Sequence, residues 1–364
     1  MTHVVHLETG RHLYGGGRQV LMLSKGLTER GVQSTLVCPP DSDIATSADP
    51  FVNVHALNMG GDLDAGFAFR FSEFLRDIEP DLVHVHSRRG ADMWGGLGAR
   101  WAKVPAVLTR RVDNPEPALL APMKYGRYQR VIGVSNGILN VLRQMGVAED
   151  KLRLVYSAVD AENCQPVWTH DQFKEAFELH DNSQTVACVA QFIPRKGHNV
   201  LFEAWADVNA ACPDARLLLF GRGPDRERLQ AQVGDSVYGA SVHFAGFRAD
   251  IRDFIGLTDV LVHPARQEGL GVVLLEAQAA GVPVIASRAG GMPEAIADGV
   301  SGELVEPGNA GELAKRLIRL LRDAELREAM GAAGRVRVAD YFSPQAMVSG
   351  NLAIYREIVD GLPR

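Results

Sequence analysis

Several features that would point to a particular class of protein are scarce or missing in this chain of 364 residues. It has four cysteines, none close to another in the sequence, and this argues against a zinc site and against a disulfide framework. No apolar run approaches the roughly 18 residues of a membrane-spanning helix. The first residues lead straight into a strand-like segment and do not read as a secretion signal. We therefore expect a protein of a reducing compartment, the cytoplasm.

The chain also lacks an excess of positive charge. Its formal net charge is -6, which gives no reason to expect nucleic acid as a partner. No internal repeat or low-complexity segment stands out. What is present is an ordinary globular composition, with 46% apolar and 23% charged residues. Because the length exceeds what one typical hydrophobic core supports, we expect two domains.

Short strand-like segments alternate with segments of helical periodicity along most of the chain. The first group, a strand at residues 4–7, a glycine-bearing loop, a helix and a strand at 33–38, forms a β-α-β unit of the parallel-sheet type. A polar, proline-containing run at residues 162–184 separates two such halves and is the expected linker. The pattern predicts an α/β protein with a first domain at residues 1–165 and a second at 166–343, followed by a helical segment at 344–364.

The most informative stretch is residues 263–307. Just before and within it, a strand-like run at residues 259–262 leads to the turn Glu-Gly-Leu-Gly at 268–271, and a helix-like segment follows at once. Gly281 is placed to end that helix in a left-handed conformation. A helix N-terminus leaves backbone N–H groups unpaired and partly positive, so phosphate oxygens are natural occupants. Glycines in the turn allow a ligand close to the backbone.

Two carboxylates, Glu268 and Glu276, frame this turn. Carboxylates would repel phosphate, so we expect them to accept hydrogen bonds from neutral hydroxyls, such as those of a sugar. The alternative is a helix with a surface glutamate near each end. In combination with the turn and the helix, the two glutamates predict an anion-binding site that also holds hydroxyl groups.

This stretch resembles the signature of retaining glycosyltransferases of family 4, which have the GT-B fold: two Rossmann-like, doubly wound domains facing each other across a cleft. The family motif has two glutamates around a glycine turn, then Gly-x-Pro-Val and Gly-Gly-x-x-Glu. Here these are Glu268, Glu276, residues 281–284 and residues 290–294. The resemblance covers almost the whole chain. It implies that the C-terminal helix, residues 344–364, crosses back to the N-terminal domain.

The resemblance also implies an activity, namely transfer of a sugar from a nucleoside diphosphate sugar to a hydroxyl of a glycan or glycolipid, with retention at the anomeric carbon. It implies neither a metal ion nor a cofactor. In the family an arginine and a lysine grip the donor diphosphate. Lys196 matches the lysine, Gln191 stands in the arginine's place, and Arg195 is a candidate to supply the missing charge. The implied donor-binding residues are Gly15, Gly16, Gly17, Arg195, Lys196, Gly246, Phe247, Glu268, Gly269, Leu270, Gly271, Val272, Val273 and Glu276.

Histidines mark the end of a predicted strand at residues 81–86. Alternation places His84 and His86 on one side of it. Because strand C-termini in open α/β sheets face the ligand crevice, His86 is better placed for function, and His84 is better explained as a core histidine. The family has a histidine at this position beside the donor sugar and acceptor. His86, Lys196 and Glu268 are therefore the predicted catalytic residues.

Basic residues follow strands of the first half. A predicted helix at residues 123–130 would carry a basic face flanked by tyrosines, which is either a solvated surface or a surface for an anionic lipid or phosphorylated saccharide. An acceptor in the bacterial envelope, such as lipopolysaccharide at the inner face of the membrane, suits these loops. Another glycolipid, a polysaccharide or a small molecule stays open, as do the donor's base and sugar. The acceptor-side candidates are Arg88, Arg89, Arg110, Arg111 and Lys124.

Two other functions are consistent with the same residues. A sugar-nucleotide epimerase or a phosphorylase of GT-B architecture would keep the fold and change the reaction. A non-catalytic sugar-nucleotide-binding member is supported by the glutamine at position 191, where the family has arginine.

Overall fold

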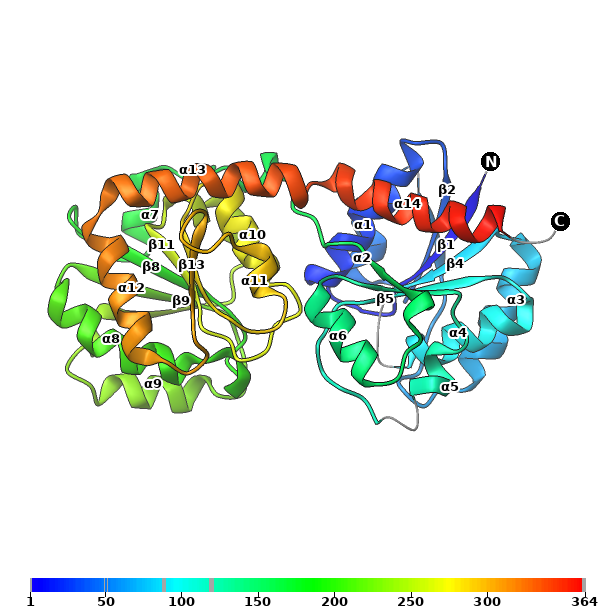
Figure 1. The fold of residues 1–364 in the computed structure, drawn as a ribbon, viewed down its shortest axis with the longest axis horizontal. Helices are drawn as coiled ribbons and strands as arrows, with labels where there is room; N and C mark the ends of the chain where they lie inside the picture. Colours follow the sequence, from blue (N-terminus) through cyan, green and yellow to red (C-terminus); the bar gives the residue numbers. More distant parts are fainter. Residues whose placement is uncertain (1, 49, 51, 87–89, 118–120, 362–364) are drawn as a thin grey trace. The chain divides into compact units, whose positions relative to one another are not determined.

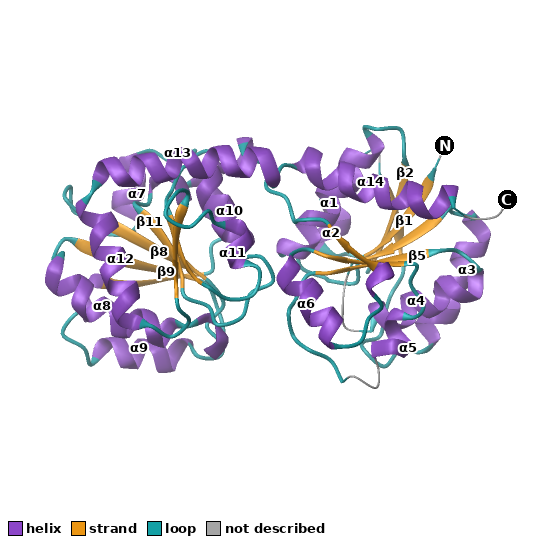
Figure 2. Cartoon of the chain, viewed as in Figure 1, coloured by secondary structure: helices purple, strands orange, loops and turns teal. Residues whose placement is uncertain are grey.

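The computed structural model describes residues 2–48, 50, 52–86, 90–117 and 121–361. The chain forms two compact units (Figure 1): Met1–Ala158 together with Pro344–Arg364, and Val159–Ser343. Each unit contains one sheet with helices packed against it (Figure 2). The α/β prediction is confirmed. The chain enters the second unit at Val159 and returns to the first at Pro344.

The first unit is built on a seven-stranded sheet in the order β3-β2-β1-β4-β5-β6-β7, whose paired strands are all parallel. Its strands are β1 (His3–Leu7), β2 (Gln33–Cys38), β3 (Asn53–Ala56), β4 (Leu82–Val85), β5 (Ala106–Arg110), β6 (Arg130–Gly133) and β7 (Leu152–Leu154). Its helices are α1 (Gly15–Thr28), α2 (Asp43–Thr46), α3 (Gly66–Ile78), α4 (Ala91–Ala102), α5 (Ala121–Tyr125), α6 (Asn136–Gln144) and α14 (Pro344–Asp360). The strand order changes direction between β1 and β4, and ligands of open α/β sheets bind at such a point.

The C-terminal helix α14 is part of the first unit's core. Its buried side chains join a hydrophobic cluster with Leu23 and Leu27 of α1 and with residues of β1, β4 and β5. Gly26 allows α1 to approach closely, since a Cβ there would lie 2.6 Å from a methyl carbon of Val348. Near its end, Glu357 accepts hydrogen bonds from Arg130 and Arg153, with shortest distances of 2.6 and 2.5 Å. Apolar packing and these ion pairs attach α14 to the sheet.

The second unit has a six-stranded sheet in the order β10-β9-β8-β11-β12-β13, again with parallel pairs. Its strands are β8 (Gln184–Val189), β9 (Ala215–Phe220), β10 (Val242–Gly246), β11 (Val260–His263), β12 (Val284–Ser287) and β13 (Gly302–Val305). Its helices are α7 (His170–Ala176), α8 (His198–Ala211), α9 (Arg226–Gly234), α10 (Val272–Ala279), α11 (Met292–Ala295), α12 (Ala310–Arg322) and α13 (Ala324–Tyr341). The change of direction falls between β8 and β11.

The run at residues 162–184 is not a linker, and that prediction was wrong. It contains α7, whose N-terminus is closed by a capping box between Thr169 and Gln172. Phe173 and Phe177 are buried against Phe254, with ring centroids 6.0 and 5.5 Å away. Polar composition hid these aromatic anchors, which hold the segment on the second unit.

Two other local predictions were also incorrect. The glycines at residues 15–17 form the first turn of α1 and not a loop. The helix predicted at residues 123–130 ends at Tyr125, and Arg130 already belongs to β6. Within the described ranges, no helix is long and apolar enough to cross a membrane.

A glycine contact in the second unit provides a test of this packing. A Cβ at Gly331 of α13 would overlap the carbonyl oxygen of Gly281, which follows α10. Gly331→Ala should therefore lower the free energy of unfolding by about 1–3 kcal/mol, because the backbones must move apart. Gly234→Ala is the control, since a Cβ there meets nothing within 4 Å. It should leave stability unchanged or raise it by up to about 1 kcal/mol. Urea unfolding midpoints measure both, and equal midpoints would contradict the packing described.

Candidate active site

The predicted donor residues of the second unit gather at the C-terminal edge of its sheet. The 3-10 turn η3 (Pro194–Lys196) follows β8, and Glu268 lies in the loop after β11. Since β8 and β11 are neighbours, the two loops emerge side by side at the point where the strand order changes direction. Gly246 ends β10, and α10 begins at Val272.

Two glycines bring the loops of this edge into contact. Gly197 has a φ of 76°, and a Cβ there would overlap the carbonyl oxygen of Pro264 in the loop after β11. Gly290, after β12, has a φ of 56°, and a Cβ there would overlap the carbonyl oxygen of Glu268. The amide of Gly291 donates to that same oxygen at 3.1 Å. Glycine is required at both positions, because a side chain would push the Glu268 loop away.

Lys196, Glu268 and His263 form a buried polar cluster. The Lys196 Nζ donates to Glu268 Oε2, and His263 Nε2 lies 2.9 Å from the same oxygen. Burial alone would raise the pKa of Glu268, but the hydrogen bond from His263 and the charge of Lys196 outweigh it and lower that pKa. Burial and the charge of Lys196 lower the pKa of His263, so this ring is neutral and donates through Nε2. The cluster is a carboxylate held ionised between a cation and a neutral donor.

Glu276, the second glutamate of the motif, is paired with Arg252. The Nε of Arg252 donates to Glu276 Oε1 at 2.8 Å, and Nη2 contacts the same oxygen. Arg252 lies in a short 3-10 turn, Ile251–Asp253, which carries no motif. The sequence therefore held no signal for this partner. The pair places a carboxylate about one turn into α10, with both arginine contacts on one of its oxygens.

The helix α10 begins without a side-chain cap. Its N-cap is Gly271, with a φ of 83°, and Gly281 beyond its C-terminus has a φ of 82°, which confirms the predicted left-handed end. Leu270 and Gly271 are buried, whereas Val272 and Val273 are partly exposed. Gly269 donates its amide to Glu268 Oε1 at 3.1 Å.

The remaining predicted residues of this unit lie in the segments that follow β8 and β10. Phe247, directly after β10, is exposed and has the guanidinium of Arg222 over its ring at 4.9 Å, a cation–π contact. Arg195 is partly exposed, and its Nη1 donates to the carbonyl oxygen of Gln267 at 3.3 Å. Gln191 is exposed. Arg195 thus reaches along the loop that carries Glu268.

In the first unit, three histidines meet where the strand order changes direction. His6 of β1 pairs in register with His84 of β4, and His86 follows β4. His84 donates or accepts at both nitrogens, with the Tyr355 hydroxyl at 2.5 Å and the Thr109 hydroxyl at 2.6 Å. This agrees with the predicted core histidine. His86 is also buried, and its Nε2 lies 3.1 Å from His6 Nδ1. Burial, followed by neighbouring basic groups, lowers the pKa of His84 and His86 well below its ordinary value.

The histidines are close enough to raise the question of a metal ion. Among the described residues, one group of three potential ligands has donor atoms all within 4.8 Å of one another, and it is His6, His84 and His86. However, both nitrogens of His84 already have hydroxyl partners, and His6 is bonded to His86. A hydrogen-bonded network accounts for the three rings without an ion.

Two of the residues predicted to form a basic acceptor-side surface are buried, so that part of the prediction is wrong. Lys124 is buried and forms ion pairs with Asp92 and Glu116. Arg110 is buried too and binds the same Glu116 at 2.7 Å. The tyrosines predicted to flank a basic face, at positions 125 and 128, lie in the core. A cation in the protein interior needs a counter-charge, and these two share one.

The other first-unit candidates are placed differently. Arg111 follows β5, and burial lowers its pKa to about 10, so it is charged at neutral pH. Its Nη1 lies 3.4 Å from the Ser157 hydroxyl, and a Cβ on Gly16 would lie 3.8 Å from its Cδ. Arg111 and the predicted glycine turn are therefore neighbours. Arg88 and Arg89 lie outside the described residues.

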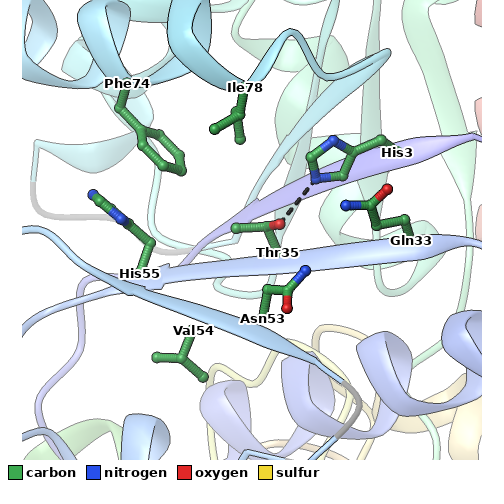
Figure 3. A pocket seen from close by; sticks show the side chains of 8 residues that line it. All are labelled: His3, Gln33, Thr35, Asn53, Val54, His55, Phe74 and Ile78. Carbon is green, nitrogen blue, oxygen red and sulfur yellow. Dashed lines mark hydrogen bonds between the residues drawn. The ribbon is translucent and has the colours of Figure 1, made fainter.

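A hollow of about 390 Å³ lies elsewhere in the first unit (Figure 3). Its polar lining includes His3, which bonds the Thr35 hydroxyl at 2.9 Å. The first residues of three strands contribute to it, so it is away from the strand ends that carry the predicted site. It is lined by His3, Gln33, Thr35, Asn53, Val54, His55, Phe74 and Ile78.

Two family models match this chain, one in each half. The family model for Glycosyl transferases group 1 matches residues 170–337, and that for Glycosyltransferase Family 4 matches residues 14–163. The chain is 31% identical over 355 residues to the lipopolysaccharide core biosynthesis glycosyltransferase LpsE of Rhizobium meliloti, covering 96% of this chain and 98% of that protein.

Two further proteins are similar to this chain. The chain is 37% identical over 203 residues to the GDP-mannose-dependent monoacylated alpha-(1-6)-phosphatidylinositol monomannoside mannosyltransferase of Corynebacterium glutamicum, a match that spans 52% of each protein. The crystal structure of Anabaena HepE in complex with UDP and glucose superposes with a TM-score of 0.85 at 20% identity, covering 100% of both chains. The chain therefore belongs to the family 4 glycosyltransferases and has their GT-B fold.

Proposed function

We propose that this glycosyltransferase moves a sugar from a nucleoside diphosphate sugar to a hydroxyl of a glycan or glycolipid, with retention at the anomeric carbon. The observation that carries the proposal is the buried Lys196–Glu268–His263 cluster beside the N-terminus of α10. It combines a cation and helix amides for phosphate with a carboxylate for a sugar hydroxyl. None of these groups alone identifies a nucleoside diphosphate sugar as the ligand. Together they offer partners for both its diphosphate and its sugar.

Departure of the nucleoside diphosphate develops negative charge on the leaving phosphate. Lys196 and the first amides of α10 are suited to stabilise that charge, and they lower the barrier only as far as they bind the transition state more tightly than the donor. In our proposal Glu268 holds the sugar and keeps Lys196 in place before the donor arrives. Glu276 receives the ribose hydroxyls.

For the donor we propose a purine or pyrimidine sugar nucleotide whose base lies against the strand end at Gly246 and Phe247. GDP-mannose is named for the Corynebacterium relative and UDP for the Anabaena structure. For the acceptor we propose a glycolipid of the bacterial envelope, because two relatives are named for phosphatidylinositol mannoside and lipopolysaccharide core. A thermal-shift panel of GDP-mannose, UDP-glucose, UDP-N-acetylglucosamine and ADP-glucose identifies the donor, because a bound ligand stabilises the fold in proportion to its affinity.

A second candidate is a non-catalytic sugar-nucleotide-binding protein, favoured by the exposed Gln191 in place of the family arginine. A third, a sugar-nucleotide epimerase, would convert the donor sugar without an acceptor and without releasing nucleoside diphosphate. Following diphosphate release with and without acceptors separates the three. Binding with no turnover across the acceptor panel would favour the second.

Lys196→Ala should lower the turnover number by about 10- to 1000-fold, because the leaving phosphate loses its cation. Lys315→Ala, which removes an exposed lysine of α12 in the same unit, is the matched control and should leave turnover unchanged. Steady-state release of nucleoside diphosphate provides the measurement. Equal turnover in both variants would remove Lys196 from the site.

Glu276→Ala should weaken binding of the nucleoside diphosphate by roughly 1.5–3 kcal/mol, since a hydrogen bond to a charged group is lost. Isothermal titration with the ribonucleotide and with its 2′,3′-dideoxy analogue isolates the contact. The wild type should prefer the ribonucleotide and the variant should not. A preference for the ribonucleotide that survives in Glu276→Ala would show that another group binds the ribose.

We also expect turnover to be independent of divalent metal. Lys196 and the α10 amides supply positive charge at the phosphate, so exhaustive dialysis against EDTA should leave the turnover number within error of the untreated enzyme. Loss of activity on chelation, restored by added magnesium or manganese, would overturn this expectation.

A further inference from the structure

His6, on the first strand of the first unit, is a buried side chain that the proposed chemistry leaves unused. It lies on β1 next to β4, at the point where the strand order of this sheet changes direction. His6 is fully buried, and His86 is 3% exposed. The two residues are 80 positions apart in the chain.

Two distances define how the rings meet. His6 Nδ1 and His86 Nε2 are 3.1 Å apart, and the ring centroids are 5.3 Å apart with an interplanar angle of 25°. The centroid separation is close to the N···N distance plus the two ring radii. The rings therefore face each other edge to edge, with the two nitrogens nearly on the line between the ring centres. This is the geometry of a good N–H···N hydrogen bond and not of face-to-face stacking.

A hydrogen bond between two neutral imidazoles restricts both tautomers. Each ring has one N–H and one acceptor nitrogen, so one of the two rings must donate. If His6 donates, the hydrogen of His86 is on Nδ1, and if His86 donates, its Nδ1 is an acceptor. The hydrogen bond thus couples the tautomer of His86, and with it the character of Nδ1, to the tautomer of His6.

The other described neighbours do not compete for this role. His84 is 3.8 Å from His86 by ring centroids, but its nitrogens are bonded to Tyr355 and Thr109. His86 Nδ1 and His6 Nε2 are both buried and have no hydrogen-bond partner among the described residues. His86 Nδ1 is therefore a buried polar atom whose hydrogen-bonding capacity is unused among the described residues.

We propose that His6 is a positioning residue of the active site, which holds the His86 ring in one plane and one tautomer so that Nδ1 meets a substrate hydroxyl. This rests on the proposed function, to which it adds the role that the family resemblance implies for His86, contact with a sugar. A neutral, oriented imidazole can donate to or accept from a hydroxyl through its second ring nitrogen. Fixing its tautomer in advance avoids reorganisation when the substrate arrives.

Histidine NMR on the ligand-free protein tests the positioning directly. In ¹⁵N-histidine-labelled protein, the two ring nitrogens of His86, assigned with His86→Gln, should show a single tautomer. His6→Leu removes the bond, and the His86 signals should shift to a mixture of tautomers. His6→Asn retains an amide near the position of Nδ1 and should restore a single tautomer. His86 signals that are the same in His6→Leu and in the wild type would overturn the proposal.

Turnover gives the second readout, with Val4→Ala as the control. Val4 is buried on the same strand and face, so its truncation weakens the core without touching the histidines. His6→Leu should lower kcat about ten- to a hundredfold, because the His86 ring loses its orientation toward the substrate hydroxyl. The KM for the donor should not change. His6→Asn should recover most of that loss, and Val4→Ala should retain wild-type kcat.

The outcomes separate the two hypotheses. If His6→Leu and Val4→Ala have the same kcat, His6 is a core residue and the positioning role is wrong. If the wild type transfers no sugar from any donor of the panel, the proposed function fails instead. The NMR result still decides in that case whether His6 sets the tautomer of His86.

Discussion

The second unit depends on one buried contact, the ion pair between Lys196 and Glu268. A lysine that is 8% exposed needs a counter-charge, and the counter-charge comes from a loop 72 residues further along the chain. That meeting is possible only because β8 and β11 are neighbours at the change of strand direction. The glycines at positions 197 and 290 then let the loops touch. The sheet topology, the loop glycines and the charge pair together position the residues of the proposed donor site.

The first unit uses a different kind of chemistry at the equivalent place. Its change of direction carries neutral histidines, whose pKa values are lowered by burial, and not an ion pair. Nearby cations such as Arg110 and Lys124 are tied to Asp92 and Glu116 and stabilise the interior. A charged site suits a diphosphate, whereas neutral hydrogen-bonding groups suit sugar hydroxyls. The first six strands of the first sheet have the same order as the six strands of the second. The two sheets differ in the side chains at the change of strand direction.

The periodicity of apolar residues predicted helices and strands well where burial of apolar side chains was the main constraint on the segment. The strands β1 and β2 and the helix α14 lie where the sequence pattern predicted them. Helix α4 escaped prediction because it contains glycines at positions 95, 96 and 98, which disfavour a helix locally. They are present because neighbouring groups are very close: a Cβ at Gly96 would lie 2.7 Å from the Tyr128 hydroxyl. Tertiary packing outweighed helix propensity there.

The sequence was enough to identify the family, the alternation of strands and helices, and the candidate site residues inside a contiguous motif, such as Glu268 and Glu276. These are local signals, because a turn, a helix start and a spacing are properties of neighbouring residues. The tertiary structure alone decided the partners: Arg252 for Glu276, His263 with Lys196 for Glu268, and His6 for His86. It also decided that Lys124 is buried. Most of these contacts join distant positions of the chain, and residues such as Lys196 and Glu268 or His6 and His86 come within hydrogen-bond reach because the strands that precede or carry them are neighbours in a sheet.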